Sequence, residues 1–172
     1  MSALAHPPRV IGVYRRGDLP RGVRGVTLAL WHVGDPGNVG TLLRAADAFG
    51  AGLALSRGCA DPTSPKALRA SMGALFRVPL AEFDEPAGPR VALVPRGGIP
   101  LPDVPVDGDV VFVLGAEREG LPRDVLDRCD LQASIPQAAD AESLNVALAG
   151  AIALYERSRT AGPGPAERGL AP

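Results

Sequence analysis

Hydrophobic and polar positions follow two kinds of pattern along this chain. Short, nearly continuous apolar runs of strand length alternate with segments in which apolar side chains recur every three or four residues. The first run is VTLALWHV at 26–33, and the segment 38–50 follows it. In that segment, helical spacing relates Val39, Leu42, Leu43, Ala46 and Phe49. We therefore predict a buried strand and then an amphipathic helix that stops at Gly50.

The same alternation continues to the end of the chain. Further strands are predicted at 52–56, 75–83, 90–95, 109–115 and 131–136, and further helices at 64–73, 121–129 and 142–158. Ser64 and Pro65 suit the N-cap and first turn of their helix. Strands that alternate with helices, and that are apolar on both faces, indicate an α/β domain with a mostly parallel sheet covered by helices on both faces.

The two ends of the chain differ from the part between them. We expect residues 1–25 to form a short, partly flexible extension with at most one short strand, and residues 26–158 to form the domain. The segment 159–172 is rich in Gly, Pro and Ala, which predicts a disordered tail.

Ligands of parallel α/β sheets bind at the carboxyl ends of the strands, and three loops there carry unusual polar residues. They are 34–40, 115–122 and 135–145. In the first, Asn38 at the mouth of a helix and Arg44 six residues on are either a cap and a solvated side chain, or an anion site. In the second, Gly115 and Gly120 flank Glu117, as in a simple strand–turn–helix link or in a loop that approaches a ligand closely.

The third loop leads into the last helix, whose first turn we expect to hold Ser143 and Asn145. From Leu144 to Leu154 the residues are apolar and mostly small, so no polar face is left for solvent. Two backbones could approach closely at its small residues, which are Ala147, Ala149, Gly150, Ala151 and Ala153. We therefore expect a homodimer with this helix in a two-fold interface.

Composition excludes several classes of function. The net charge is −1, so nothing in the overall charge favours nucleic acid, although 17 of the 18 basic residues are Arg. Cys59 and Cys129 lack CxxC spacing and a histidine cluster, so we read them as structural thiols and expect no metal. We see no signal peptide and no apolar run long enough to span a membrane, and we expect a cytoplasmic protein. His6 and His32 are read as structural or exposed.

Known nucleotide-binding motifs are missing. No GxGxxG follows the first strand and no GxxxxGK[ST] occurs, which disfavours a dinucleotide-binding fold or a P-loop enzyme.

Taken together, four segments resemble the SpoU/TrmH class of SPOUT RNA methyltransferases. They are NVGTLLRAADAFGA (38–51), SPKALRASMGALFRVPL (64–80), VFVLGAEREGLP (111–122) and IPQAADAESLNVALAGAIALYE (135–156). Their order and spacing match the class, and they extend over nearly the whole predicted domain.

The resemblance implies a C-terminal trefoil knot, a homodimer, and transfer of a methyl group from S-adenosyl-L-methionine to a ribose 2′-hydroxyl of rRNA or tRNA. It implies that the cofactor is bound by Gly115, Gly120, Ile135 and Leu144, mainly through backbone groups. It implies that the active site is formed by Asn38, Arg44, Glu117, Ser143 and Asn145. Arg44 has been the class's candidate base, but a guanidinium keeps its protons, so we expect it to hold a phosphate instead.

Two residues depart from the class pattern. Arg118 stands where glycine is usual, and Gln137 follows Ile135 and Pro136 where methionine is commoner. The short N-terminal extension leaves no room for a separate RNA-binding domain, so we expect local contacts to RNA through arginines, namely Arg15, Arg16, Arg21, Arg24, Arg69 and Arg77. The alternatives are a non-catalytic RNA-binding homologue and an α/β nucleotide-binding enzyme of another kind.

Overall fold

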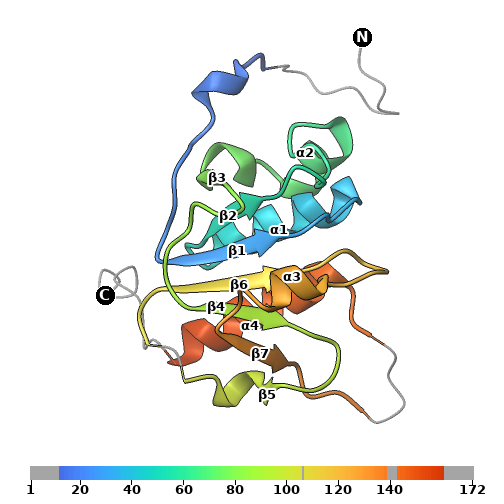
Figure 1. The fold of residues 1–172 in the computed structure, drawn as a ribbon. Helices are drawn as coiled ribbons and strands as arrows, with labels where there is room; N and C mark the ends of the chain where they lie inside the picture. The colour runs from blue at the N-terminus through green and yellow to red at the C-terminus, as the bar shows by residue number, and fades with distance from the viewer. Residues whose placement is uncertain (1–11, 106, 139–142, 161–172) are drawn as a thin grey trace.

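A computed structural model of the chain describes residues 12–105, 107–138 and 143–160. Seven strands form one sheet in the order β3-β2-β1-β6-β4-β7-β5, and every pairing between them is parallel (Figure 1). The strands are β1 (Val26–Leu30), β2 (Gly52–Leu55), β3 (Leu80–Glu82), β4 (Arg90–Leu93), β5 (Ile99–Pro100), β6 (Val110–Leu114) and β7 (Leu131–Ser134). The predicted parallel α/β sheet is confirmed.

Helices cover both faces of this sheet. The α-helices are α1 (Pro36–Ala48), α2 (Pro65–Ser71), α3 (Arg123–Leu126) and α4 (Val146–Thr160), and the 3₁₀ helices are η1 (Arg16–Asp18), η2 (Ala74–Phe76) and η3 (Leu101–Asp103). In Figure 1, α3 lies in front of the sheet and α4 behind it.

The central strands are almost wholly apolar because each face of the sheet has its own core. Leu28 and Leu30 of β1 belong to the larger core, which includes the buried side chains of α1 and α4. Ala29, between them, belongs to a smaller core with Val125 of α3. Alternate side chains of a strand point to opposite faces, so a strand with two covered faces needs apolar residues at every position.

Several boundaries differ from those predicted. Helix α1 begins at Pro36, ahead of the predicted start at 38, because the Asp35 side chain caps it, accepting hydrogen bonds from the backbone N–H groups of Gly37 (2.6 Å) and Asn38 (3.0 Å). Helix α4 begins at Val146, four residues after the predicted start. The predicted strand 75–83 is divided into η2 and β3, and neither β5 nor the 3₁₀ helices were predicted.

Helix α4 is less symmetric than its composition suggests. Ala147, Gly150 and Ala153 are buried against the chain's own core, and a Cβ at Gly150 would lie 2.4 Å from Cδ2 of Leu42. The expectation that these small residues face a second subunit was wrong. The outward stripe carries large side chains instead, and it consists of Leu148, Ile152 and Tyr155.

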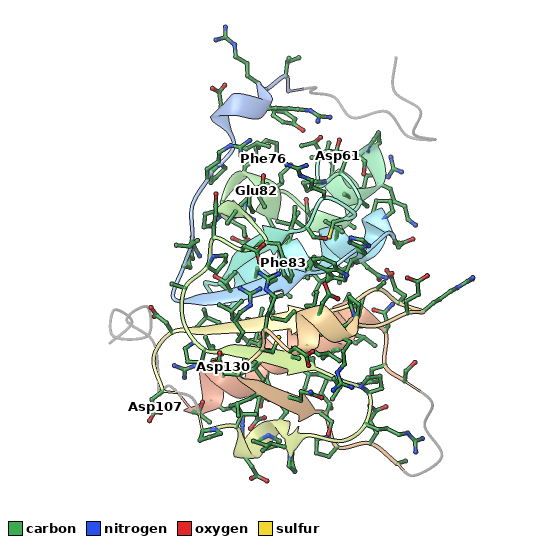
Figure 2. All side chains as sticks on the ribbon, viewed as in Figure 1. Asp61, Phe76, Glu82, Phe83, Asp107 and Asp130 are labelled. Carbon is green, nitrogen blue, oxygen red and sulfur yellow. The ribbon has the colours of Figure 1, made fainter. Side chains whose placement is uncertain are left out.

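The N-terminal segment runs beside the sheet. Between residues 12 and 25 no strand forms, but Pro20 and Gly22 exchange backbone hydrogen bonds with Leu80 of β3. Phe76 projects toward this segment, and its ring meets that of Tyr14 edge-on at 4.9 Å (Figure 2). Residues 1–11 of the predicted extension and 161–172 of the predicted tail lie outside the described residues, while Arg159 and Thr160 still belong to α4.

The described helices are all too short or too polar to cross a bilayer. The trefoil knot implied by the resemblance stays a prediction.

Candidate active site

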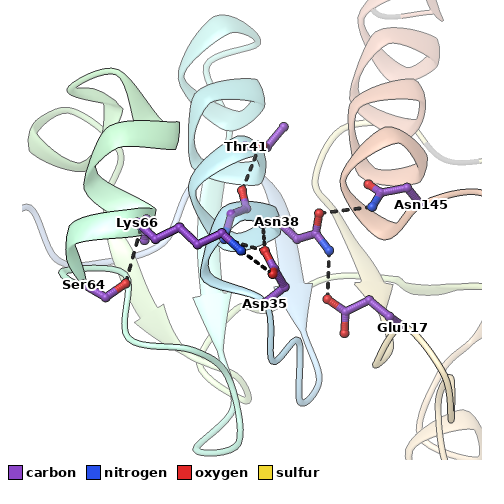
Figure 3. A network of polar contacts seen from close by, with 9 residues as sticks. Asp35, Asn38, Thr41, Ser64, Lys66, Glu117 and Asn145 are labelled. Carbon is purple, nitrogen blue, oxygen red and sulfur yellow. Dashed lines mark hydrogen bonds and ion pairs between the residues drawn. The ribbon is translucent and has the colours of Figure 1, made fainter. Parts of the chain in front are cut away.

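Three polar side chains from distant parts of the sequence meet at the carboxyl ends of β1 and β6. Asn38 in the first turn of α1 donates from Nδ2 to Oε1 of Glu117 at 2.9 Å (Figure 3). Asn145, just before α4, donates from Nδ2 to Oδ1 of Asn38 at 3.1 Å. Asn38 therefore uses both ends of its amide, and its orientation is fixed by the residues on either side. Three of the five predicted active-site residues form one network.

Asn145 has a second role in the same place. Its Oδ1 accepts hydrogen bonds from the backbone N–H groups of Ala147 (2.9 Å) and Leu148 (3.3 Å). These are bonds of an N-cap, so Asn145 precedes the helix and does not lie in its first turn as predicted. Because the cap holds the amide by its oxygen, the Nδ2 group is directed at Asn38.

On the other side of α1, the network is supported by an ion pair. Lys66 of α2 donates from Nζ to Oδ2 of Asp35 at 2.6 Å, while Oδ1 of Asp35 caps α1 (Figure 3). The hydrogen bond from Lys66, followed by the backbone N–H of Asn38, lowers the pKa of the Asp35 carboxyl below its usual value. The only lysine of the chain thus fixes the start of the helix that presents Asn38.

A half-open cavity of about 300 Å³ lies beside this network. It is bounded by the carboxyl ends of β4, β6 and β7 and by the start of α4, and its lining is Leu93, Val94, Pro95, Leu114, Gly115, Ala116, Glu117, Arg118, Gly120, Ile135, Gln137, Ser143, Leu144, Asn145, Val146 and Ala149. All four residues expected to bind the cofactor, Gly115, Gly120, Ile135 and Leu144, are part of this wall.

The two glycines of this wall permit a tight loop. Gly120 has a positive φ of 67°, and its N–H donates to the carbonyl of Ala116 at 2.9 Å. A Cβ at Gly115 would lie 2.3 Å from the carbonyl carbon of Gly120 and 2.6 Å from the backbone nitrogen of Leu121. Because both neighbours are backbone, no other residue fits at 115 unless the loop moves.

Next to the cavity is an open groove of about 710 Å³. Its lining is His32, Gly34, Asp35, Asn38, Gly58, Ala116, Glu117, Arg118, Glu119 and Asn145. Glu117, Arg118 and Asn145 line both hollows. The polar network therefore lies at the boundary between the cavity, whose lining side chains are mostly apolar, and the open groove, whose lining side chains are mostly polar.

The remaining predicted site residues lie outside the network. Ser143 is exposed and lines the cavity. Arg44 is exposed on α1, borders neither hollow, and has no hydrogen bond or ion pair with any described residue. Six residues separate it from Asn38, which turns the two side chains about 120° apart and about 9 Å along the helix. Glu117 accepts a hydrogen bond from Asn38 and makes none with Arg44.

Other candidate chemistry lies away from this edge. Within the described ranges, no group of three or more His, Cys, Asp or Glu side chains is arranged to hold a metal ion. Cys59 and Cys129 are half-buried free thiols. Burial raises the pKa of the Cys129 thiol, which favours its neutral form.

Sequence reasoning missed three contributions to the site. Asp35 was overlooked as a cap, although Asp followed by Pro is a usual start of a helix. Leu93, Val94 and Pro95 line the cavity from β4, and their apolar run gave no sign of it. His32 was read as structural or exposed, and it lines the groove.

Comparisons with known proteins agree with this geometry. Residues 25–155 match the SpoU rRNA Methylase family. An uncharacterized tRNA/rRNA methyltransferase of Synechocystis is 38% identical over 143 residues, which are 77% of this chain and 52% of the relative. The 23S rRNA guanosine 2′-O-methyltransferase RlmP of Bacillus subtilis is 35% identical, over 72% of this chain and 54% of its own length. The chain thus spans about half the length of these curated relatives.

Solved structures give the same picture. The AdoMet-bound rRNA methyltransferase from Sinorhizobium meliloti has a TM-score of 0.74 and 36% identity, covering 83% of this chain and 59% of that one. The SpoU methyltransferase AviRb from Streptomyces viridochromogenes, in complex with AdoMet, has a TM-score of 0.72 and 31% identity, covering 78% and 59%. The family match covers well over half of the chain, and this chain belongs to the SpoU rRNA methylase family.

Proposed function

We propose that this protein transfers a methyl group from S-adenosyl-L-methionine to a ribose 2′-hydroxyl in RNA. The observation that carries the proposal is the half-open cavity beside the open groove, with Glu117, Arg118 and Asn145 on the boundary. A cofactor in the first and an RNA strand in the second would meet at that boundary. RlmP, a 23S rRNA 2′-O-methyltransferase, supports the choice of substrate, and AviRb, whose structure contains AdoMet, supports the choice of cofactor.

The cavity suits a nucleoside cofactor. Leu114, Ile135 and Leu144 offer apolar surface, and the loop at 115–120 presents backbone rather than side chains. Backbone N–H and C=O groups that line such a loop are available to bind a purine and a ribose. When bound, S-adenosyl-L-methionine supplies an activated methyl group, so the protein needs only to align the acceptor.

The polar residues would align that acceptor. Asn38 is fixed at both ends of its amide, and the second N–H of its Nδ2 is left for the ribose or its phosphate. Arg44 and Arg118 have no partner among the described residues and are free to hold RNA phosphates bidentately. A guanidinium does not accept a proton, so the proton of the 2′-hydroxyl leaves to a phosphate oxygen or to water. Most of the acceleration then comes from positioning.

The test uses methyl-labelled S-adenosyl-L-methionine with unmodified transcripts of rRNA and tRNA, followed by alkaline digestion. Alkali cleaves RNA only beside a free 2′-hydroxyl, so a labelled, alkali-resistant dinucleotide is the expected product, and it identifies the target. Label in single nucleotides would mean base methylation and overturn the proposal. Cofactor binding without transfer to any RNA, including assembled ribosomal subunits, would favour a non-catalytic RNA-binding protein.

We further propose that the protein acts as a homodimer through the outer stripe of α4. Leu148 and Tyr155 are 55% and 54% exposed, and Ile152 lies between them at helical spacing. Phe49, at the end of α1, extends the stripe, since its ring lies 6.5 Å from that of Tyr155. Four exposed large apolar side chains in one row mark a contact surface.

Sedimentation tests this assembly. Leu148→Glu places a charge at one end of the stripe, on a side chain that is 55% exposed, and should convert a dimer into a folded monomer. Met72→Glu, a charge on an exposed apolar residue away from the stripe, is the control. A wild-type monomer at micromolar concentration would contradict the proposal.

A further inference from the structure

His32 has an unusual backbone. Its φ is +52°, and among the described residues Met72 is the other non-glycine with a positive φ. This left-handed conformation is uncommon for a residue with a Cβ, and it persists where the surroundings impose it. His32 follows β1 directly, at the carboxyl edge of the sheet that carries the candidate active site.

Three neighbours hold the imidazole in place. Its ring stacks on the indole of Trp31, with 4.6 Å between centroids and 4° between planes. Its backbone N–H donates to Oγ of Ser56 at 3.0 Å. A Cβ at Gly58 would lie 2.4 Å from Cδ2 and 2.8 Å from Nε2 of the imidazole, so glycine is what leaves room for the ring.

His32, whose imidazole is held in this way, is exposed and lines the open groove together with Asn38, Glu117 and Asn145. Neither of its nitrogens has a hydrogen-bond partner anywhere in the described ranges. Asn38, by contrast, has both ends of its amide occupied. A donor that is held rigidly in a groove and has no partner in the protein is available to a ligand.

The charges of the groove indicate which ligand would use this donor. Three carboxylates line it, from Asp35, Glu117 and Glu119, against one guanidinium, from Arg118. An RNA strand is a polyanion, so its phosphates need hydrogen-bond donors in order to bind beside these carboxylates. Among the side chains of this wall, the imidazole of His32 and the guanidinium of Arg118 are donors that have no hydrogen-bond partner within the described ranges.

We propose that His32 binds the RNA in the groove, through a hydrogen bond from its imidazole to a nucleotide that flanks the methylated one. The inference rests on the proposed function for the identity of the ligand. Trp31, Ser56 and Gly58 act as positioning residues, since they hold the imidazole or make room for it.

The first experiment compares steady-state kinetics of three variants. His32→Gly keeps the backbone conformation and removes the ring, and Gly58→Ala keeps the ring and displaces it. Both should raise the KM for RNA about tenfold, the loss expected for one hydrogen bond to a charged group. The Kd for S-adenosyl-L-methionine and kcat should stay within about twofold, because the cavity is untouched. Met72→Gly relieves a similar left-handed residue outside the groove and should leave all three constants unchanged.

The second experiment uses Trp31, the sole tryptophan of the chain, as a probe. Because Trp31 stacks on His32, an RNA oligonucleotide should change its fluorescence with a midpoint close to the KM. Gly58→Ala should weaken that response about tenfold.

The two proposals fail differently. An active wild type whose KM for RNA is unchanged in both His32→Gly and Gly58→Ala would overturn the role of His32 and leave the proposed function standing. Trp31 fluorescence that stays constant at RNA concentrations that saturate turnover would also overturn it. A wild type that binds RNA with the Trp31 response but transfers no methyl group to any RNA would overturn the proposed function and support His32 as an RNA contact.

Discussion

The half-open cavity and the open groove lie side by side at one edge of the sheet, yet their walls consist of different kinds of residues. The cavity is formed by apolar side chains and by the backbone of the loop 115–120, which only glycine at 115 allows. The groove is formed by polar side chains, and Asn38, Glu117 and Asn145 hold one another there. A backbone site depends on the path of the chain, whereas a side-chain site depends on residue type.

This difference predicts different responses to substitution. The cavity should tolerate changes of apolar side chains that conserve volume, and fail when the backbone is displaced. When single polar groups of the groove are removed, the groove should keep its shape but lose activity.

The largest effect is expected at Gly115. In Gly115→Ala the added Cβ collides with the backbone of Gly120 and Leu121, so the loop must move out of its present path. We expect the affinity for S-adenosyl-L-methionine to fall at least 100-fold and the free energy of unfolding by about 1–3 kcal/mol. Calorimetric titration measures the affinity. Gly17→Ala, where nothing lies within 4 Å of the new Cβ, is the matched control, and equal affinities in the two variants would contradict a backbone site.

The next largest effect is expected for the polar network. Substitutions of Asn145 separate its effect on kcat from its effect on stability. Asn145→Asp keeps an N-cap oxygen for α4 but removes the donor to Asn38 and adds a charge near Glu117. We expect kcat to fall about 100-fold, as for other positioned donors, while stability stays near that of the wild type.

The partner variant Asn145→Ala loses both functions. Its kcat should fall similarly, and its free energy of unfolding should fall by about 1 kcal/mol for the missing cap. Urea unfolding and single-turnover kinetics measure the two effects. Full activity in Asn145→Asp would show that the network holds the fold and takes no part in methyl transfer.

A smaller effect is expected at Arg44, which stands apart from both hollows. Arg44→Lys keeps the charge and removes the fork that grips a phosphate with two hydrogen bonds. We expect turnover to fall about tenfold, and the affinity for the cofactor to stay unchanged. Arg159→Lys, an exposed arginine at the end of α4 that lies away from both hollows, is the control. Turnover near that of the wild type would count against bidentate gripping.

The smallest effect concerns the support behind the groove, and it depends on pH. The pKa of Asp35 is lowered in the folded protein, so the stability it contributes is present above its unfolded pKa of about 3.9 and is lost as the pH falls through the folded value. Asp35→Asn keeps a good cap and removes the charge that Lys66 holds.

The Asp35→Asn variant should be less stable than the wild type by under about 1 kcal/mol at pH 7, because the ion pair is exposed, and equal to it near pH 2. Thermal unfolding across this range measures the difference, and Lys66→Met should give the same profile. A difference that persists at pH 2 would assign the effect to packing.

The sequence by itself determined the elements of the sheet and the residue types of the groove. Apolar runs marked β1, β2, β4, β6 and β7, since a strand covered on both faces must be apolar throughout. Asn38, Glu117 and Asn145 were identified from their motifs because their role depends on their side chains.

Tertiary structure alone decided where these residues meet and which of them do not. It placed Arg44 on another side of α1 and buried small residues of α4 in the core of the same chain. It also placed His32 in the groove beside the network. It also formed the cavity wall from Leu93, Val94 and Pro95, which no motif marks. The physical reason is that backbone contacts and helix faces depend on how distant strands assemble, and a linear pattern of residue types does not record that assembly.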